Sequence, residues 1–305
     1  MASLSRAASA QVIADDAPRL NPHSFQLAAL SAPAVLFTFA MIAFPFCYAI
    51  WLGFHSFSAT GHSRFVGLDN YRKLIGDVEF WNGLYVTFAL YFLGLALQIA
   101  GGIYLAILLF NAKRLSGFMR SLFISPILLP SAVAGMMWII ILDPSIGLAN
   151  YLLSLVGLPP SEWIASPVWV IPTIALIDTW HWTPYVALIV LGGLQSLPQN
   201  VFEAAQIDGA SPARTFWRIT LPLLLPTIVT ATVLRSVDLL RFFDIIYIMT
   251  QGGPGNASNT LNVYGFKIGF EYFNIGYASA LMLTLSTIVL GVVLTLNRLR
   301  KAVAW

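Results

Sequence analysis

Residues 201–222 read VFEAAQIDGASPARTFWRITLP and form a polar turn between two long apolar segments. Residues 201–208 are rich in helix-forming types, and Gly209 can adopt the left-handed conformation in which helices often end. Ser211 followed by Pro212 is typical of an N-cap and the first residue of a second helix. The stretch therefore predicts two short helices exposed on one face of a membrane.

The first of these helices has a surface suited to another protein. Ala204 and Ala205 carry little bulk, so the backbone of a partner can come close, and Glu203 and Asp208 offer it charge. An ordinary amphipathic loop with a chance EAA sequence is the alternative.

This stretch resembles the EAA loop in the inner-membrane permease subunits of binding-protein-dependent ABC importers, where EAA is followed by Gly and later by Ile and Leu-Pro. The later counterparts here are Ile219 and Leu221-Pro222, and residues 208–210, DGA, are similar to the carbohydrate-importing branch. The resemblance implies that the first helix is a coupling helix seated in a cleft of an ATPase subunit. The coupling residues that it implies are Glu203, Ala204, Ala205, Asp208 and Gly209.

The composition is that of an integral membrane protein. Of 305 residues, 58% are hydrophobic and only 10% are charged, and the mean hydropathy is +0.79; soluble domains carry about 25% charged residues. A span needs roughly 20 apolar residues. We expect an all-α protein with six transmembrane helices at about 26–54, 82–110, 119–142, 167–193, 222–248 and 275–298.

Lys and Arg indicate the orientation, because they concentrate in cytoplasmic loops. With both termini cytoplasmic, ten of them lie inside, and only Arg64, Arg72, Lys73 and Lys267 lie outside. The net charge of +3 is thus a signal of topology and gives no reason to expect nucleic acid. The ten are Arg6, Arg19, Lys113, Arg114, Arg120, Arg214, Arg218, Arg298, Arg300 and Lys301.

The predicted organisation is a cytoplasmic tail at 1–25, a permease domain at 26–299 and a short cytoplasmic tail at 300–305. Within the domain, residues 195–222 form the cytoplasmic coupling loop. The outer loops are long enough for short surface helices. Residues 65–71 and 146–153 carry the mixed apolar and turn residues of such helices.

Prolines and glycines make the spans irregular. Pro126 and Pro130 in the third span predict a kink, which membrane helices tolerate where neighbours or a cavity satisfy the freed carbonyls. Gly94, Gly101 and Gly102 in the second span permit close helix packing. Cys47 in the first span predicts a packed core thiol.

Two groups of ionisable residues fall inside predicted spans, where each costs about 2.5–3.5 kcal/mol. Asp178 and His181 lie in the fourth span, and the fifth carries four charges spaced by three residues. That spacing places Arg235 near Asp238. It places Arg241 near Asp244 in the same way. Internal ion pairing and direct contact with a solute are equally open. The predicted solute pathway comprises Asp178, Trp180, His181, Trp182, Tyr185, Arg235, Asp238, Arg241 and Asp244.

The resemblance continues past the turn, at residues 243–254 and 276–280, and covers roughly 26–299. It is closest to the maltose- and glycerol-phosphate-type permeases, and it implies a type I ABC importer permease-like fold in the bacterial inner membrane. It also implies three kinds of partner: a homologous second permease, two ATPase subunits and an outer solute-binding protein. The implied cargo is a sugar, a sugar alcohol or a sugar derivative, moved by alternating access.

The chain itself lacks the signals of an enzyme. None of its lysines lies in the Gly-x-x-x-x-Gly-Lys-Ser/Thr pattern, so ATP and Mg²⁺ belong on the partner ATPase and no cofactor or metal is expected here. One competing function is an ion-gradient-driven transporter that uses Asp178, His181 and Asp238 as a proton relay. An intramembrane enzyme is another, but it needs a nucleophile with a base or a metal cluster, and Asp178 and His181 have no motif-bearing serine or cysteine beside them.

Overall fold

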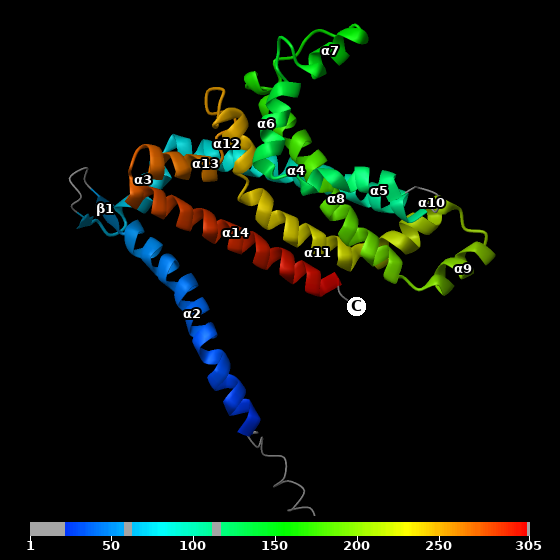
Figure 1. Cartoon of the computed structure of the whole chain (residues 1–305), viewed down its shortest axis with the longest axis horizontal. Helices are drawn as coiled ribbons and strands as arrows, with labels where there is room; N and C mark the ends of the chain where they lie inside the picture. Colours follow the sequence, from blue (N-terminus) through cyan, green and yellow to red (C-terminus); the bar gives the residue numbers. More distant parts are fainter. Residues whose placement is uncertain (1–21, 58–62, 112–116, 304–305) are drawn as a thin grey trace, which may run out of the picture. The chain divides into compact units, whose positions relative to one another are not determined.

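The computed structural model describes residues 22–57, 63–111 and 117–303, and its regular structure is almost entirely helical (Figure 1). The chain divides into two compact units, residues 1–51 and residues 52–305. Much of the predicted tail at 1–25 and the end of the tail at 300–305 lie outside the described residues. So do four of the predicted inner cations, Arg6, Arg19, Lys113 and Arg114.

The first unit consists, in its described residues, of most of helix α2 (Pro22–Gly53). Residues 29–53 are apolar enough to cross a membrane, and none of residues 29–51 is buried. Cys47 is exposed on this helix, so the prediction of a packed core thiol is wrong. Among the described residues of this unit, no second element covers the thiol.

In the described part of the chain, five helices are long and apolar enough to span a membrane, and the number is six if one sharply bent pair counts as a single span. The bent pair is the predicted third span. It divides into α5 (Gly117–Ile124), the 3₁₀ turn η1 (Ser125–Leu128) and α6 (Ser131–Ile141), with a bend of 105°. Pro126 and Pro130 lie at the break, as expected, because each removes a backbone donor.

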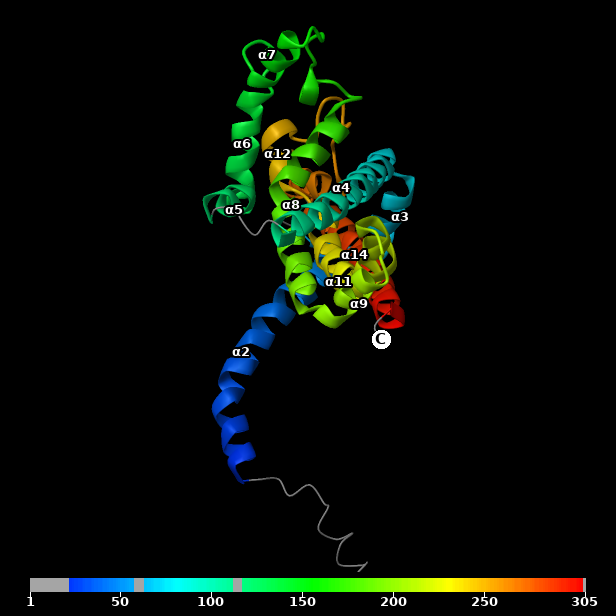
Figure 2. The same ribbon diagram turned by 90° about the vertical axis from the view of Figure 1, so that its right-hand side faces the viewer.

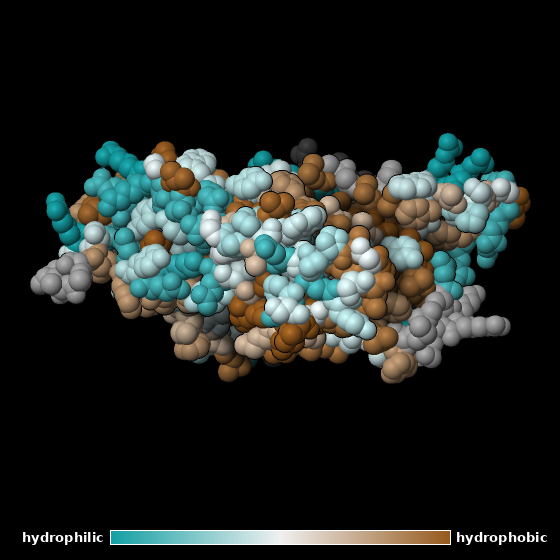
Figure 3. Space-filling view, turned by 90° about the horizontal axis from the view of Figure 1, so that it is seen from above, coloured by the Kyte–Doolittle hydropathy of each residue, from teal (hydrophilic) through white to brown (hydrophobic). Residues whose placement is uncertain are grey.

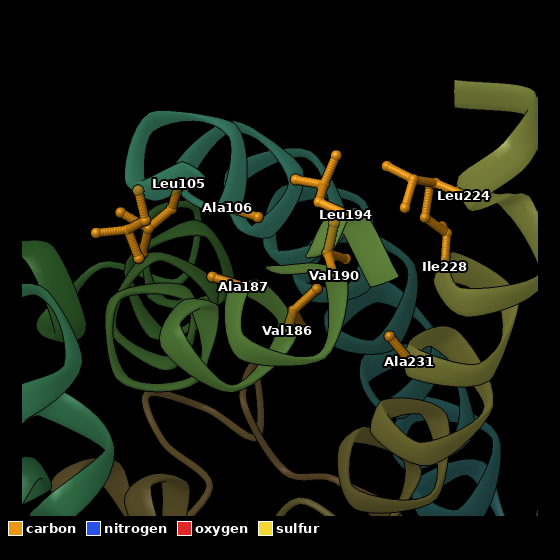
Figure 4. Close-up of a cluster of buried hydrophobic side chains, with 10 residues drawn as sticks. Leu105, Ala106, Val186, Ala187, Val190, Leu194, Leu224, Ile228 and Ala231 are labelled. Carbon is orange, nitrogen blue, oxygen red and sulfur yellow. The ribbon is translucent and has the colours of Figure 1, made fainter. Parts of the chain in front are cut away.

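The core of the second unit lies among four long helices that run alongside one another in Figures 1 and 2. They are α4 (Val78–Asn111), α8 (Val170–Ser196), α11 (Leu221–Leu240) and α14 (Ile275–Val303). Figure 4 shows one buried cluster, to which α4, α8 and α11 all contribute; its members include Leu105, Val186, Val190, Leu224 and Ile228.

The predicted fifth span is not one continuous helix. The helix that carries it starts ten residues before the predicted start at 222, as α10 (Pro212–Thr215), passes through the π-helical turn η3 (Phe216–Thr220) into α11, and ends at Leu240; α12 (Asp244–Thr250) follows after a break. No proline or glycine marks this break. The carbonyls that it frees are satisfied from the following segment: Asn262 donates to the oxygen of residue 241 at 2.7 Å and Thr260 to that of residue 242 at 3.4 Å.

Short elements lie in the parts of the second unit that are distant from α9 (Gln199–Ile207) and α10 (Figure 1). Two of them, α3 (Asp69–Gly76) and α7 (Leu148–Leu155), begin two to four residues after the predicted surface helices. The other short elements, none of them predicted, are β1 (His55–Phe57) paired antiparallel with β2 (Ser63–Phe65), η2 (Trp163–Ala165), α13 (Leu261–Phe266) and η4 (Lys267–Glu271).

In Figure 3, hydrophilic residues gather toward both ends of the long axis of the view, and more hydrophobic surface lies between them.

Asp77, which lies just before α4, holds the start of that helix against α13 and α14. Its carboxylate accepts hydrogen bonds from the Tyr264 hydroxyl at 2.6 Å, from the Tyr277 hydroxyl, and from the Glu79 N–H at 2.9 Å. Burial alone would raise the pKa of the Asp77 carboxyl, but these hydrogen bonds and one from the Phe80 N–H outweigh burial and lower the pKa. One ionised group thereby joins α4, α13 and α14.

Close packing of α4 on α8 yields the first prediction. A Cβ on Gly102 would lie 2.4 Å from Val186 Cγ1 and 3.2 Å from the Ala187 nitrogen, so Gly102→Ala must push the two helices apart. Overpacking of this kind costs about 1–3 kcal/mol. We expect a lower midpoint of thermal unfolding for the detergent-purified protein.

The matched control is Gly192→Ala, because a Cβ on this α8 glycine meets no atom within 4 Å. It should leave the midpoint unchanged or raise it slightly, since Ala favours helix. Equal midpoints for the two variants would contradict the packing argument.

Candidate functional site

A buried cluster of three polar side chains joins α4, α8 and α11. The Arg235 guanidinium donates through Nη2 to Asp178 Oδ2 and through Nε to Gln98 Oε1, both at 2.6 Å. The Gln98 amide completes the triangle by donating to the same carboxylate oxygen, also at 2.6 Å. The three residues are at most 1% exposed. A charge buried this deeply is tolerated only when it is paired and hydrogen-bonded.

The sequence predicted part of this cluster. The pair of Arg235 with Asp238 is present, with Nη1 and Oδ2 3.5 Å apart, but the Asp238 side chain is 51% exposed. The stronger pair joins Arg235 to Asp178 of another helix, which spacing along one helix cannot reveal. Gln98 was missed altogether; its one signal is an amide within the charge-free run 81–112.

The prediction that Arg241 pairs with Asp244 is wrong. Within the described ranges, no ion pair joins Arg241 to Asp244. The expectation assumed continuous helix at three-residue spacing, whereas the helix ends before Arg241 and a new one begins at Asp244. Both side chains are exposed instead.

A cavity of about 450 Å³ opens beside the cluster. Five residues of the predicted solute pathway line it, and four further lining residues were not predicted. The predicted ones are Trp182, Arg235, Asp238, Arg241 and Asp244; the others are Ser131, Phe242, Phe243 and Asn262. The missed residues lie at the start of α6, at the helix break and on α13, three places that come together only through the bends of the chain.

Arg235 reaches this cavity while remaining paired behind it. Its guanidinium carbon lies 4.5 Å from the centre of the Trp182 ring, a cation–π arrangement that also covers one face of the indole. One cation therefore contacts the buried carboxylate of Asp178, the exposed carboxylate of Asp238 and an aromatic face.

The remaining predicted pathway residues do not line the cavity. Trp180 packs edge-on against Trp138 with ring centroids 5.5 Å apart, and Tyr185 packs against the apolar cluster of α4, α8 and α11. His181 is 1% exposed, and its Nε2 lies 2.9 Å from the carbonyl oxygen of Leu129. Asp178 lies behind the cavity wall, where it contacts Arg235, which lines the cavity. The nine residues of the predicted solute pathway thus divide between cavity and core.

No group of three or more His, Cys, Asp or Glu side chains that could hold a metal ion occurs in the part of the chain that the structure describes.

The polar turn has the predicted local structure. Helix α9 (Gln199–Ile207) is followed by Gly209 at φ +67°, and the Ser211 hydroxyl then accepts the Arg214 N–H at 3.4 Å to cap α10. Glu203, Ala204, Asp208 and Gly209 are exposed. Ala205, however, is only 5% exposed, so it supports the helix from beneath and does not face outward.

Exposed apolar side chains adjoin the turn. Ile207 is 87% and Trp217 is 65% exposed. A second, mainly apolar cavity of about 1200 Å³ lies against this region, lined by residues of α4, α9, η3 and α11, among them Phe202, Gln206 and Trp217. The turn therefore combines fixed geometry, exposed charge and uncovered apolar surface.

Comparison with known proteins identifies a family and relatives of this chain. Residues 98–300 match the family described as binding-protein-dependent transport system inner membrane component. The trehalose/maltose transport system permease protein MalF of Thermococcus litoralis is 34% identical over 88% of this chain and 90% of its own. The sulfoquinovosyl glycerol transport system permease protein SmoG of Agrobacterium fabrum is also 34% identical, over 88% of this chain and 89% of its own.

A solved structure resembles the fold. A chain of a bacterial alginate ABC transporter, crystallised with an alginate pentasaccharide-bound periplasmic protein, matches with a TM-score of 0.81 at 22% identity. The match covers 92% of this chain and 96% of that one.

The buried cluster yields the second prediction. Arg235→Met leaves the Asp178 carboxylate buried without its counter-ion, and loss of one partner of such a pair costs about 3–5 kcal/mol. We expect a marked fall in the thermal unfolding midpoint of the purified protein. Arg241→Met, an exposed arginine outside any described ion pair, is the control and should change the midpoint little. Equal effects of the two substitutions would refute the assignment of Asp178 as the buried counter-ion.

Proposed function

The chain belongs to the family of binding-protein-dependent transport system inner membrane components, and on this premise we propose that it imports a sugar, a sugar alcohol or a sugar derivative by ATP-driven alternating access. It is a multi-pass inner-membrane permease subunit. Its relatives serve trehalose/maltose and sulfoquinovosyl glycerol transport systems, which favours a carbohydrate cargo. The chain contributes translocation, and a separate ATPase hydrolyses ATP with Mg²⁺.

The turn formed by α9, Gly209 and α10 is the observation that carries this proposal. A rigid, exposed helix with Glu203 and Asp208 on its surface is suited to a cleft of an ATPase subunit. The proposed assembly contains this chain, a homologous second permease, two ATPase subunits and an outer solute-binding protein. Both chain termini lie in the cytoplasm in this proposal.

Helical structure links the turn to the cavity. From Pro212 to Leu240 the chain is helical without interruption, through α10, η3 and α11. At 1.5 Å per residue, about 35 Å separates the cap at Ser211 from Arg235. A displacement of the turn by the ATPase would thus move α11 as one body and shift Arg235 and Asp238 at the cavity wall.

The cavity suits a polar solute of modest size. Its volume of about 450 Å³ lies within the usual range for small-molecule sites, about 300–1,000 Å³. Asp238, Arg241 and Asn262 can bond hydroxyl groups, and Phe242 and Phe243 offer apolar faces to the C–H side of a sugar ring.

The proton-relay alternative has less support. Asp178 is already engaged by Arg235 and Gln98, and His181 bonds to the carbonyl of Leu129 and to neither carboxylate. Among the described residues, Asp178 and Asp238 are linked through the Arg235 guanidinium, which keeps its proton and so cannot relay one.

The proposed function predicts that solute uptake follows ATP hydrolysis. The chain, co-expressed with its neighbouring permease, ATPase and binding protein, should be purified as one complex and reconstituted in vesicles. Accumulation of a radiolabelled sugar should require both ATP and the binding protein. Accumulation that is driven by a proton gradient and is insensitive to ATP would favour the relay instead.

The coupling role of the turn is tested by Glu203→Lys. Charge reversal on the exposed face of α9 should uncouple or detach the ATPase, and uptake should fall at least tenfold while binding of sugar by the solute-binding protein is unchanged. Asp69→Lys, on an exposed face of α3 at the opposite end of the unit, is the matched control and should transport normally. Normal uptake by the Glu203 variant would rule out this role for α9.

A further inference from the structure

We propose that Asp178, which does not line the cavity, sets the cavity's electrostatic sign, so that the cavity accepts neutral or cationic solutes and disfavours anions. The sign of the cavity follows from the structure alone, whereas the statement about the solute rests on the proposed function.

Arg235 is a cation that is already compensated. A guanidinium keeps its proton in a protein, and one that is 1% exposed needs a counter-ion beside it. Asp178 supplies that charge at 2.6 Å and is itself 1% exposed. Arg235 therefore presents donors and a flat surface to the cavity, but little net charge.

The other charged groups that line the cavity include more carboxylates than guanidinium groups. Apart from Arg235, the charged residues that line the cavity are Asp238, Arg241 and Asp244, all exposed. Two carboxylates against one guanidinium leave one net negative charge. If Arg235 stood unpaired, the same lining would be neutral, and its positive side would attract a phosphate, sulfonate or carboxylate. The buried residue behind the wall thus decides the sign.

Gln98 keeps this arrangement in place without altering the charge. Its amide donates to Asp178 and accepts from Arg235, each at 2.6 Å, so it fixes the distance between cation and anion. Gln98 and Asp178 are positioning residues in this scheme: they act on the solute through Arg235.

The test measures the cavity charge directly with a thiol. Ser131 lines the cavity, so Ser131→Cys is introduced into the complex after the exposed native thiol is removed by Cys47→Ala. The readout is the ratio of modification rates by a trimethylammonium-ethyl and a sulfonato-ethyl methanethiosulfonate. Ser154→Cys, exposed on the uncharged helix α7, provides the reference ratio.

We expect the cavity thiol to favour the cationic reagent relative to the reference thiol. Asp178→Asn should lower this preference, by about fourfold or more for a unit charge about 10 Å away in a medium of the dielectric constant of water. The double variant Asp178→Asn/Arg235→Gln, which removes both charges, should return the ratio to the parental value. A purely structural role of Asp178 would not produce this reversal.

A ratio that Asp178→Asn leaves unchanged, or that the double variant fails to restore, overturns the inference. Should Asp178→Asn not fold, Arg235→Gln is compared with the double variant, and adding the Asn must lower the ratio to the parental value. The measurement needs no transport. Its failure therefore contradicts this inference alone, whereas the lack of ATP-driven uptake by the parental complex contradicts the proposed function.

Discussion

A guanidinium cannot remain in the apolar interior of this protein unless other helices bring it partners. Arg235 meets that requirement with a carboxylate from α8 and an amide from α4, at 2.6 Å from each. Three helices that are far apart in the sequence are thereby fixed at one level. The apolar contacts of the bundle, such as the cluster around Val186 and Leu224, set how closely these helices pack, but they do not by themselves select one register. The ionic cluster supplies that selection.

The sequence predicted the features that depend on local chemistry. Apolar runs gave the long helices, Pro126 and Pro130 gave the break in the third span, and Gly209 with Ser211 gave the two helices of the turn. Each of these follows from the conformational preference of a residue or from a charge-free stretch. None of these three features depends on contacts with other helices of the bundle.

What the sequence could not show depends on contacts between distant segments. Spacing along α11 identified Asp238 as a partner of Arg235, but the closer partner, Asp178, lies 57 residues away. The break after Leu240 has no proline or glycine to announce it, and it is held by side chains of Asn262 and Thr260 from the following segment. That same break removed the predicted Arg241–Asp244 pair and created much of the cavity wall. Cys47 was misjudged because an apolar helix was assumed to have neighbours.

Helix α4 shows how small residues make the ionic cluster possible. Gly94, Gln98 and Gly102 are spaced by four residues and so lie along one face of the helix. A Cβ on Gly94 would lie 3.1 Å from Leu239 of α11, and one on Gly102 would lie 2.4 Å from Val186 of α8. The absence of side chains at the two glycines lets both helices approach α4 closely enough for the amide between them to reach Asp178 and Arg235 together. Close packing and charge neutralisation are therefore one arrangement, and a residue that widened either glycine contact would also weaken the buried ion pair.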